Sequence, residues 1–201
     1  LPRWGGYLNW TYGTPVIMFL YPGIPYVSAL INLATGLRFI DIYKLLMITT
    51  YVLSGWFWFC WIKSLKFSSV AALIGSLFYL LAPYRLVNIF VRGALAEHIG
   101  FLWFPLIMWV STRYFQSQGR RKLILLSVFT AGLILSHNLS AVLYLPIVFI
   151  YPIILRIKPA LLVRYYLAIS GGFFLCAFFW MPVLLEKKNI YQIKKVAEFL
   201  S

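Results

Sequence analysis

Long apolar runs, separated by short polar stretches, recur along the whole of the 201-residue chain. A helix needs about 20 mostly apolar residues to cross the hydrocarbon core of a bilayer, and these runs approach that length. Because the runs follow one another closely, the chain leaves no room for a sizeable domain in water. The pattern predicts an all-α fold, a polytopic transmembrane helical bundle of about six spanning helices. They are expected at residues 43–62, 68–82, 98–114, 122–137, 140–155 and 164–183.

A further apolar stretch, residues 16–36, is interrupted too often to count as a span. Pro15, Pro22 and Pro25 break it, and only about ten residues follow before Gly36, half of what spanning needs. We therefore expect a short interfacial helix at the outer face of the membrane. The aromatic residues before it suit the headgroup level of a bilayer; they are Trp4, Tyr7, Trp10 and Tyr12.

The chain is interpreted as one membrane domain, residues 1–201, in three parts. Residues 1–42 form an outer loop with the interfacial helix, residues 43–183 form the bundle, and residues 184–201 begin an outer tail. Leu1 is not an initiator methionine, and the residues after it lack the charged and apolar regions of a signal peptide. We expect the sequence to be a fragment of a longer chain.

Composition excludes a soluble protein. Hydrophobic residues make up 63% of the chain and charged residues 11%, whereas soluble domains contain about a quarter charged residues. The formal net charge is +14, from 18 Lys and Arg against 4 Asp and Glu. In a soluble protein this excess would suggest binding to nucleic acid. In an integral, multi-pass membrane protein it indicates loops that face anionic lipid headgroups, so membrane lipids and no nucleic acid are the expected partners.

Charge also predicts the orientation of the chain. Basic residues are equally numerous on the two sides of the membrane, but those on one side crowd into short loops without any acidic residue. Cytoplasmic loops are enriched in Lys and Arg, so this side is expected to be cytoplasmic. Residues 1–42, 83–97 and 136–140 and the tail then lie at the outer face. The basic residues of the cytoplasmic side are Lys63, Lys66, Arg113, Arg120, Arg121, Lys122, Arg156, Lys158 and Arg164.

The block "PYRLVNIFVRGALAEHIGF", residues 83–101, gathers charged side chains between two apolar runs. On a continuous helix Arg85, Asn88 and Arg92 fall within about 60° of one another and form a polar stripe. Guanidinium groups match phosphate oxygens, so the stripe predicts a phosphate site. Glu97 lies about 140° from Arg92 on the helical wheel, and the two would meet only if the chain bends at Gly93.

Each of these charged residues also has a purely structural interpretation. Arg85 and Arg92 could snorkel to lipid headgroups without binding a specific ligand. Glu97 begins a predicted span, where a carboxylate is favourable because of the helix dipole alone.

A second polar group, "LSHNLSA" at residues 135–141, joins two apolar helices with almost no loop. In one interpretation His137 and Asn138 satisfy helix-end carbonyl groups, and Ser140 caps the next helix. In the other, His137 faces the same outer cleft as Arg92 and Glu97. The spacing alone leaves both interpretations open.

Several stretches together resemble a known family: "LPRW", "YGTP" followed by "FLYPG", "PYRLVNIFVRGALAE" and "SHNLSA". They resemble the membrane proteins called 6-pyruvoyl-tetrahydropterin-synthase-related, which in spite of that label are not pterin enzymes. Those proteins look like members of the GT-C superfamily of polytopic glycosyltransferases. The resemblance implies an enzyme of a prokaryotic cytoplasmic membrane that takes a sugar from a polyprenyl-phosphate donor at the outer face.

The resemblance also implies where a site would lie. GT-C-like enzymes hold a catalytic carboxylate in the first outer loop, but residues 1–40 contain none. The resemblance therefore implies a base upstream of Leu1, with Glu97 as the substitute within this chain. No cofactor is implied with certainty, and a divalent metal stays an open alternative. The implied substrate-binding residues are Arg3, Tyr12, Arg85, Asn88, Arg92, His137 and Asn138.

A rival function needs the same outer cleft without catalysis. A carrier or transporter of lipid-linked glycans would bind the same lipid phosphate, and a scaffold subunit would bind nothing there. Few polar residues continue through the spans, which disfavours transport.

Overall fold

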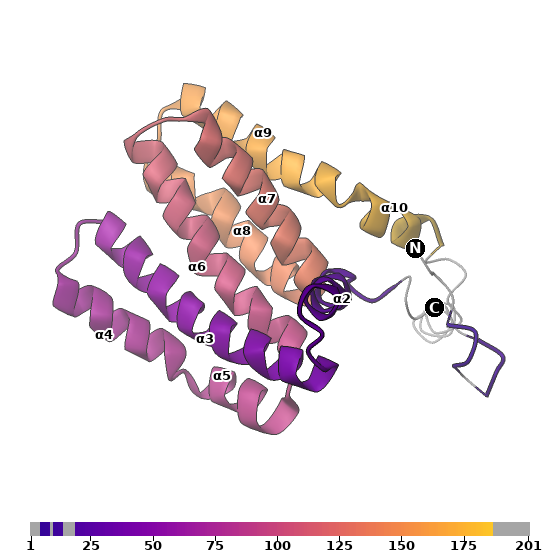
Figure 1. Ribbon diagram of the computed structural model, residues 1–201. Helices are drawn as coiled ribbons and strands as arrows, with labels where there is room; N and C mark the ends of the chain where they lie inside the picture. Colours follow the sequence, from indigo (N-terminus) through magenta and orange to yellow (C-terminus); the bar gives the residue numbers. More distant parts are fainter. Residues whose placement is uncertain (1–4, 9, 14–18, 187–201) are drawn as a thin grey trace, which may run out of the picture.

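The computed structural model describes residues 5–8, 10–13 and 19–186 (Figure 1). Within these residues the chain is helical and contains no β-strand element. The helices are α2 (Gly23–Thr35), α3 (Phe39–Ser64), α4 (Ser69–Leu80), α5 (Pro83–Val87), the π-helical turn η1 (Asn88–Arg92), α6 (Leu95–Gln116), α7 (Arg120–Ser136), α8 (Asn138–Ile154), α9 (Pro159–Leu175) and α10 (Ala177–Glu186). The all-α prediction is confirmed for the described part of the chain.

The predicted segments are helical, but two of the expected continuous helices are broken. The segment expected at 164–183 consists of α9 and α10, which bend by 67° at Cys176. The block that begins at Pro83 is a short helix followed by the π-helical turn. The short helix expected after Pro22 is present as α2, and it ends at Gly36, whose φ of 69° is left-handed.

Fewer helices than the expected six meet the length and hydropathy requirements of a membrane span. Among the described residues α3 and α6 meet them alone, and two bent pairs raise the number to four: α4 with α5–η1, and α9 with α10. The helices α7 and α8 have 17 residues each, because the chain breaks between them at His137. At 1.5 Å per residue they reach about 25 Å, against a hydrocarbon core of about 30 Å.

The helix α6 is the centre of the bundle. It packs against α3 on one side and α7 on the other, and α8 also contacts it (Figure 1). The helices α4 and α9 extend this layer beyond α3 and α7, respectively. Most side chains of α6 are buried, whereas α3 keeps a wide exposed face. The largest fully buried apolar side chains around α6 are Ile107, Met108, Tyr114, Leu126, Leu133, Val148, Tyr165 and Ile169.

Small residues allow the helices to approach one another closely. A Cβ atom added at Gly172 of α9 would lie 2.6 Å from Thr130 Cβ on α7, and one at Gly55 of α3 would lie 2.6 Å from Leu80 Cδ1. At Gly100 of α6 it would lie 2.7 Å from Ser140 Oγ on α8. Helix association through small residues is typical of bundles in lipid, where close van der Waals packing replaces the hydrophobic effect.

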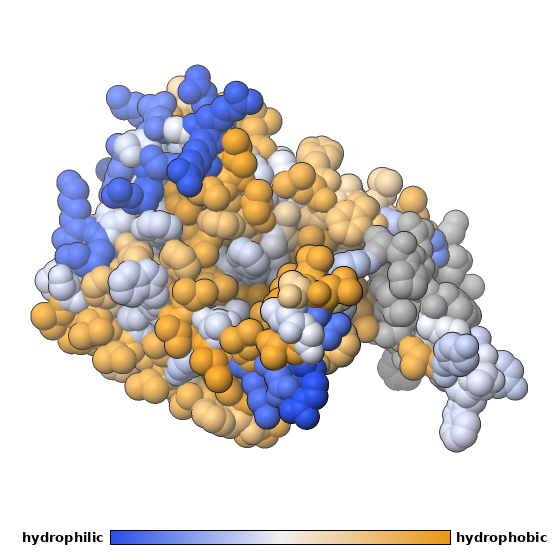
Figure 2. All heavy atoms as spheres, in the orientation of Figure 1, coloured by the Kyte–Doolittle hydropathy of each residue, from blue (hydrophilic) through white to orange (hydrophobic). Residues whose placement is uncertain are grey.

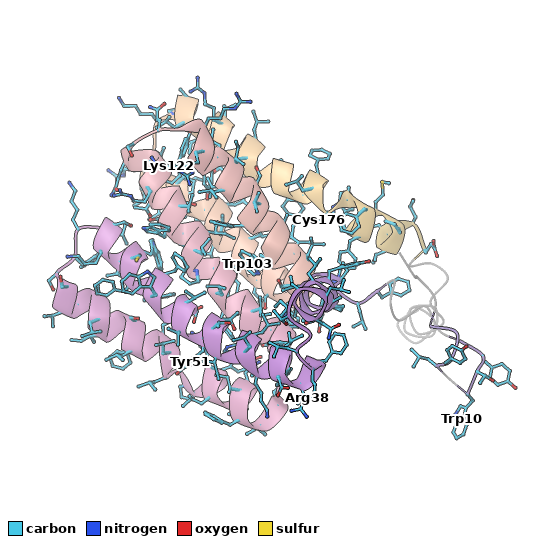
Figure 3. All side chains as sticks on the ribbon, viewed as in Figure 1. Trp10, Arg38, Tyr51, Trp103, Lys122 and Cys176 are labelled. Carbon is cyan, nitrogen blue, oxygen red and sulfur yellow. The ribbon has the colours of Figure 1, made fainter. Side chains whose placement is uncertain are left out.

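On the face that Figure 2 shows, charged residues gather at the two ends of the bundle, and mostly apolar residues lie between them. Lys122 marks one end and Arg38 the opposite end (Figure 3). We call the first the basic end, defined by Arg113, Arg120, Arg121, Lys122, Arg156, Lys158 and Arg164. The second is the mixed-charge end, defined by Arg38, Asp41, Lys44, Arg92 and Glu97. Between the ends the exposed apolar side chains include Ile48, Val52, Trp56, Leu73, Phe78, Leu167 and Phe174.

Alanine at Gly172 is expected to destabilise the protein by about 1–3 kcal/mol, because the new Cβ would overlap Thr130 and the backbone of Ser127. Gly75→Ala is the matched control, since its Cβ would meet only Trp58 Nε1 at 3.5 Å, an ordinary contact. Thermal unfolding in detergent should show a lower midpoint for Gly172→Ala and an unchanged or higher midpoint for Gly75→Ala. Equal midpoints would show that the α7–α9 contact is not close-packed.

Candidate functional site

The candidate site lies at the mixed-charge end, where α5, η1 and the start of α6 form a reversal of the chain. Pro83 begins α5, where its fixed φ suits the first turn of a helix. Gly93 ends η1 with a φ of 57°, in the left-handed region that costs glycine little. The chain then turns directly into α6 at Leu95. The Tyr43 hydroxyl on α3 donates to the Gly93 carbonyl at 2.8 Å and fixes the turn to the bundle.

The turn brings Arg92 and Glu97 together. Arg92 Nη1 lies 2.8 Å from Glu97 Oε2, so the contact expected from a bend at Gly93 is present. The Tyr84 hydroxyl donates to Glu97 Oε1 and accepts a hydrogen bond from Arg92 Nη1 at 3.1 Å. The Glu97 side chain is 11% exposed and the Arg92 side chain 47% exposed. We call these three residues the Arg92 cluster.

The arrangement assigns different tasks to Glu97 and Arg92. Both carboxylate oxygens of Glu97 accept hydrogen bonds within the cluster, so this group holds Arg92 rather than standing free as a base. The Arg92 guanidinium forms two hydrogen bonds with described residues, and Nη1 donates both of them. The rest of this half-exposed group is directed to neither partner, and it can meet an anion from outside.

The predicted stripe of Arg85, Asn88 and Arg92 is wrong. Arg85 is 1% exposed and Asn88 is fully buried, whereas Arg92 lies at the surface. The π-helical turn holds one residue more than an α-helical turn, which rotates Arg92 by about 100° away from the face of Arg85. Arg85 and Asn88 therefore do not belong to the outer surface of the site.

The Arg85 guanidinium neither snorkels nor faces solvent. Its carbon Cζ lies 4.6 Å from the centre of the Tyr79 ring, 4.9 Å from that of Phe101 and 5.2 Å from that of Tyr51. Its Nη2 donates to Ser54 Oγ at 2.8 Å. These contacts come from α3, α4 and α6, so Arg85 joins three helices through cation–π contacts and one buried hydrogen bond.

The turn between α7 and α8 supplies His137. Its backbone is extended, with φ −161° and ψ 111°, and its Nδ1 accepts the backbone N–H of Ser140 at 3.2 Å. His137 is therefore the N-cap of α8, and the expectation that Ser140 caps this helix is wrong. Ser140 Oγ lies 2.8 Å from the same Nδ1. Asn138 is the first residue of α8, and its Oδ1 is buried without a hydrogen-bond partner among the described residues.

His137 lies on the same side of the bundle as the Arg92 cluster. Gly100, one turn after Glu97, contacts Ser140 Oγ, which is paired with His137. The ring of Tyr21, just before α2, meets the ring of His137 edge-on with centroids 5.2 Å apart. Burial lowers the pKa of His137; the nearby Glu97 charge raises it and that of Arg92 lowers it. The imidazole is thus neutral at pH 7 and its Nδ1 can accept the capping hydrogen bond.

The other candidate residues do not join this group in the described structure. Tyr12 is 83% exposed, and its side chain makes no hydrogen bond or aromatic contact among the described residues. Arg3 lies outside the described residues. For the divalent metal left open above, residues 5–8, 10–13 and 19–186 contain no cluster of three His, Cys, Asp or Glu side chains that could hold an ion.

Tyr84, Tyr43 and Tyr21 are members of the site that were not among the predicted site residues. Tyr84 precedes its partners by 8 and 13 residues, so no helical spacing connects it to Arg92 or Glu97. Tyr43 reaches Gly93 across 50 residues. The available signal was the presence of Tyr84 inside the same polar block.

The chain has no match among protein-family models, and neither a curated protein nor a solved structure is significantly similar to it. The residues and their geometry therefore carry the functional argument.

Arg85→Ala is expected to lower stability by about 2–4 kcal/mol, because it empties a packed site between three helices. Arg85→Lys should not restore stability, since an ammonium group lacks the planar surface that stacks on Tyr79 and Phe101. Thermal unfolding in detergent measures both variants. A wild-type midpoint for Arg85→Ala would show that the buried guanidinium stabilises nothing.

His137 predicts a pH dependence of stability. Because its pKa is lowered in the folded protein, the unfolded chain binds the proton more tightly than the folded chain does. The contribution of His137 to the free energy of unfolding is therefore complete above a histidine's ordinary pKa of about 6.5 and is lost as the pH falls below it. His137→Asn keeps a capping acceptor without titrating. Between pH of about 7.5 and 5.5 the unfolding midpoint of the wild type should fall more than that of His137→Asn. Parallel midpoints would exclude His137 as the titrating group.

Proposed function

We propose that this chain is a multi-pass membrane protein that binds a lipid-linked phosphate at its mixed-charge end, as a GT-C-like glycosyltransferase with a polyprenyl-phosphate sugar donor. The single observation that carries the proposal is the Arg92 cluster. It presents a half-exposed guanidinium, held by a nearly buried carboxylate, at the charged end of an otherwise apolar bundle.

The apolar surface supports membrane embedding. Soluble monomers rarely expose apolar surface of this extent. The proposed bundle crosses the membrane six times. Four crossings are single helices, namely α3, α6, α7 and α8, and two are the bent pairs, α4 with α5–η1 and α9 with α10. The two 17-residue helices fall short of the hydrocarbon thickness by only about 5 Å, which local thinning of the bilayer accommodates.

The two ends of the bundle support the proposed orientation. The described acidic residues lie away from the basic end, and we assign this end to the cytoplasm by the positive-inside rule. The mixed-charge end then faces outward, with the α7–α8 turn and the start of α2 beside it. Gly23, at the start of α2, packs against the carbonyl of Leu135 near the end of α7, which supports a position of this short helix at the rim of the proposed site. We assign α2 to the outer interface.

Arg92 suits a phosphate that stays at the level of the headgroups. A guanidinium group offers paired N–H donors that match phosphate oxygens, and its charge does not depend on pH. The polyprenyl chain of the donor would remain among the apolar residues exposed beside the site, such as Phe90 and Val91. In sugar transfer Arg92 would stabilise the negative charge that develops on the departing phosphate.

The remaining residues of the site act on orientation. Glu97 and Tyr84 are positioning residues, because they act through Arg92. His137, neutral and directed to Ser140, caps the start of α8 and shapes the neighbouring wall. On the resemblance alone, the base that deprotonates the acceptor hydroxyl would be a carboxylate of the first outer loop, which residues 1–40 do not supply.

One observation favours a non-catalytic carrier as the second candidate function. Both oxygens of Glu97 are engaged within the Arg92 cluster, so this carboxylate is not free to take a proton from an acceptor. A carrier of lipid-linked glycans needs the phosphate site and no base.

Arg92→Ala is expected to weaken binding of a short polyprenyl-phosphate sugar by about tenfold or more, equivalent to about 1.4 kcal/mol. The protein is titrated in nanodiscs, and bound donor is measured at equilibrium. Arg38→Ala is the matched control, because Arg38 is an exposed arginine at the same end, paired with Asp41 at 2.8 Å. Arg92→Lys should recover only part of the affinity, since it restores charge without the paired donors.

The outcomes separate the candidate functions. Loss of binding in Arg92→Ala alone supports the phosphate site, and sugar transfer by the wild type then distinguishes an enzyme from a carrier. Equal affinity in Arg92→Ala and Arg38→Ala would reject Arg92 as a donor ligand.

A further inference from the structure

A groove of 320 Å³ runs between α7 and α9 at the basic end, remote from the Arg92 cluster. Arg120, at the start of α7, and Arg164, in the second turn of α9, line its charged part. Leu123, Ile124 and Leu167 line its apolar part. It is thus an amphipathic groove with two guanidinium groups beside apolar side chains.

The groove closes deeper in the bundle. Ser127 Oγ donates to the Ala168 carbonyl at 2.7 Å and ties α7 to α9. One turn further along α9, Gly172 approaches α7 so closely that an added Cβ would lie 2.7 Å from the Ser127 carbonyl oxygen. From Arg120 to Ser127 the groove extends over eight residues of α7, which are seven steps of 1.5 Å, or about 10 Å. That length suits a glycerol backbone and the first part of an acyl chain.

The charges at the groove favour an anion. Arg120 and Arg164 are exposed, and neither forms a salt bridge in the described part of the chain. The described acidic residues Asp41, Glu97 and Glu186 lie at the starts of α3 and α6 and at the end of α10, away from this end (Figure 1). Among the described residues, therefore, no carboxylate near the groove competes for the two guanidinium groups.

The apolar walls favour a lipid over a free phosphate. Ile124 is 54% exposed and Leu167 is 66% exposed, and both line the groove. A small water-soluble anion would leave them uncovered, whereas an acyl chain that enters beside the phosphate would cover them. Basic pockets between helices at the cytoplasmic face are a recognised kind of site for anionic lipid headgroups.

We propose that this groove binds one anionic phospholipid, with its phosphate between Arg120 and Arg164 and an acyl chain along Ile124 and Leu167. A lipid held there contacts both α7 and α9, so it stabilises the position of the two helices relative to each other at the basic end. The inference requires the helices to be embedded in a membrane, and it is independent of the donor site at the opposite end.

The test uses the full chain in detergent micelles, titrated with dioleoyl phosphatidylglycerol or dioleoyl phosphatidylcholine, with bound lipid counted by native mass spectrometry. The double variant Arg120→Gln/Arg164→Gln removes the charges of the groove. The matched control Arg121→Gln/Lys158→Gln removes two exposed charges from the same end that do not line the groove. Glycerol phosphate serves as the soluble headgroup probe.

The wild type and the control should bind phosphatidylglycerol about tenfold more tightly than phosphatidylcholine, and the groove variant should lose this preference. Equal loss in both double variants would overturn the proposal, because the preference would then follow the charge of the whole end. Glycerol phosphate binding as tight as that of the lipid would overturn it as well, since the apolar walls would contribute nothing. If the wild type binds phosphatidylglycerol and phosphatidylcholine equally tightly, the proposed lipid site is rejected.

Discussion

The reversal of the chain at Gly93 is the constraint on which the candidate site depends. A left-handed residue at this point lets α6 begin with only Gly93 and Ala94 between it and the π-helical turn. The turn then sets Arg92 over the first turn of α6, where Glu97 receives it. Tyr43 holds the glycine carbonyl from α3, so the reversal is also tied to the rest of the bundle. Without this turn Arg92 and Glu97 would lie on different faces of one helix.

Arginine serves three separate purposes in this chain, and its surroundings decide which one. Arg85 is enclosed by three aromatic rings and one hydroxyl, and it stabilises the contact among α3, α4 and α6. Arg92 is half-exposed and held by a carboxylate, which orders it for the proposed ligand. Arg120 and Arg164 stand at the surface beside apolar residues, without a carboxylate partner among the described residues. The proposed division of the ends into an outer donor site and an inner lipid site follows from these differences.

The packing of the bundle relates these sites to one another. The small residues Gly100 and Gly172 bring α6 to α8 and α7 to α9, respectively. At the mixed-charge end this approach places His137 beside the first turn of α6, and near the basic end it closes the deep part of the lipid groove. The same kind of contact thus positions a wall of one site and the floor of the other.

The sequence by itself determined the all-α class, most helix positions, and the gathering of polar residues at the ends of the helices. Those properties are local, because apolar runs, prolines and glycines act within a few residues. It also showed that Arg92 and Glu97 would meet only if the chain bends at Gly93, without deciding whether it does. Tertiary structure alone decided that Arg85 is buried, that His137 rather than Ser140 caps α8, and that Tyr84 completes the cluster.

The physical reason is that these outcomes depend on contacts between residues far apart in the sequence or on one extra residue in a turn. The rings of Tyr51 and Phe101 reach Arg85 from different helices, and the hydroxyl of Ser54 reaches it across 31 residues. The extra residue in η1 changes the face on which every later side chain of that segment lies, and a regular helical period cannot show it. Helical spacing predicts which residues share a face of one helix, whereas only packing decides whether that face meets lipid, water or another helix.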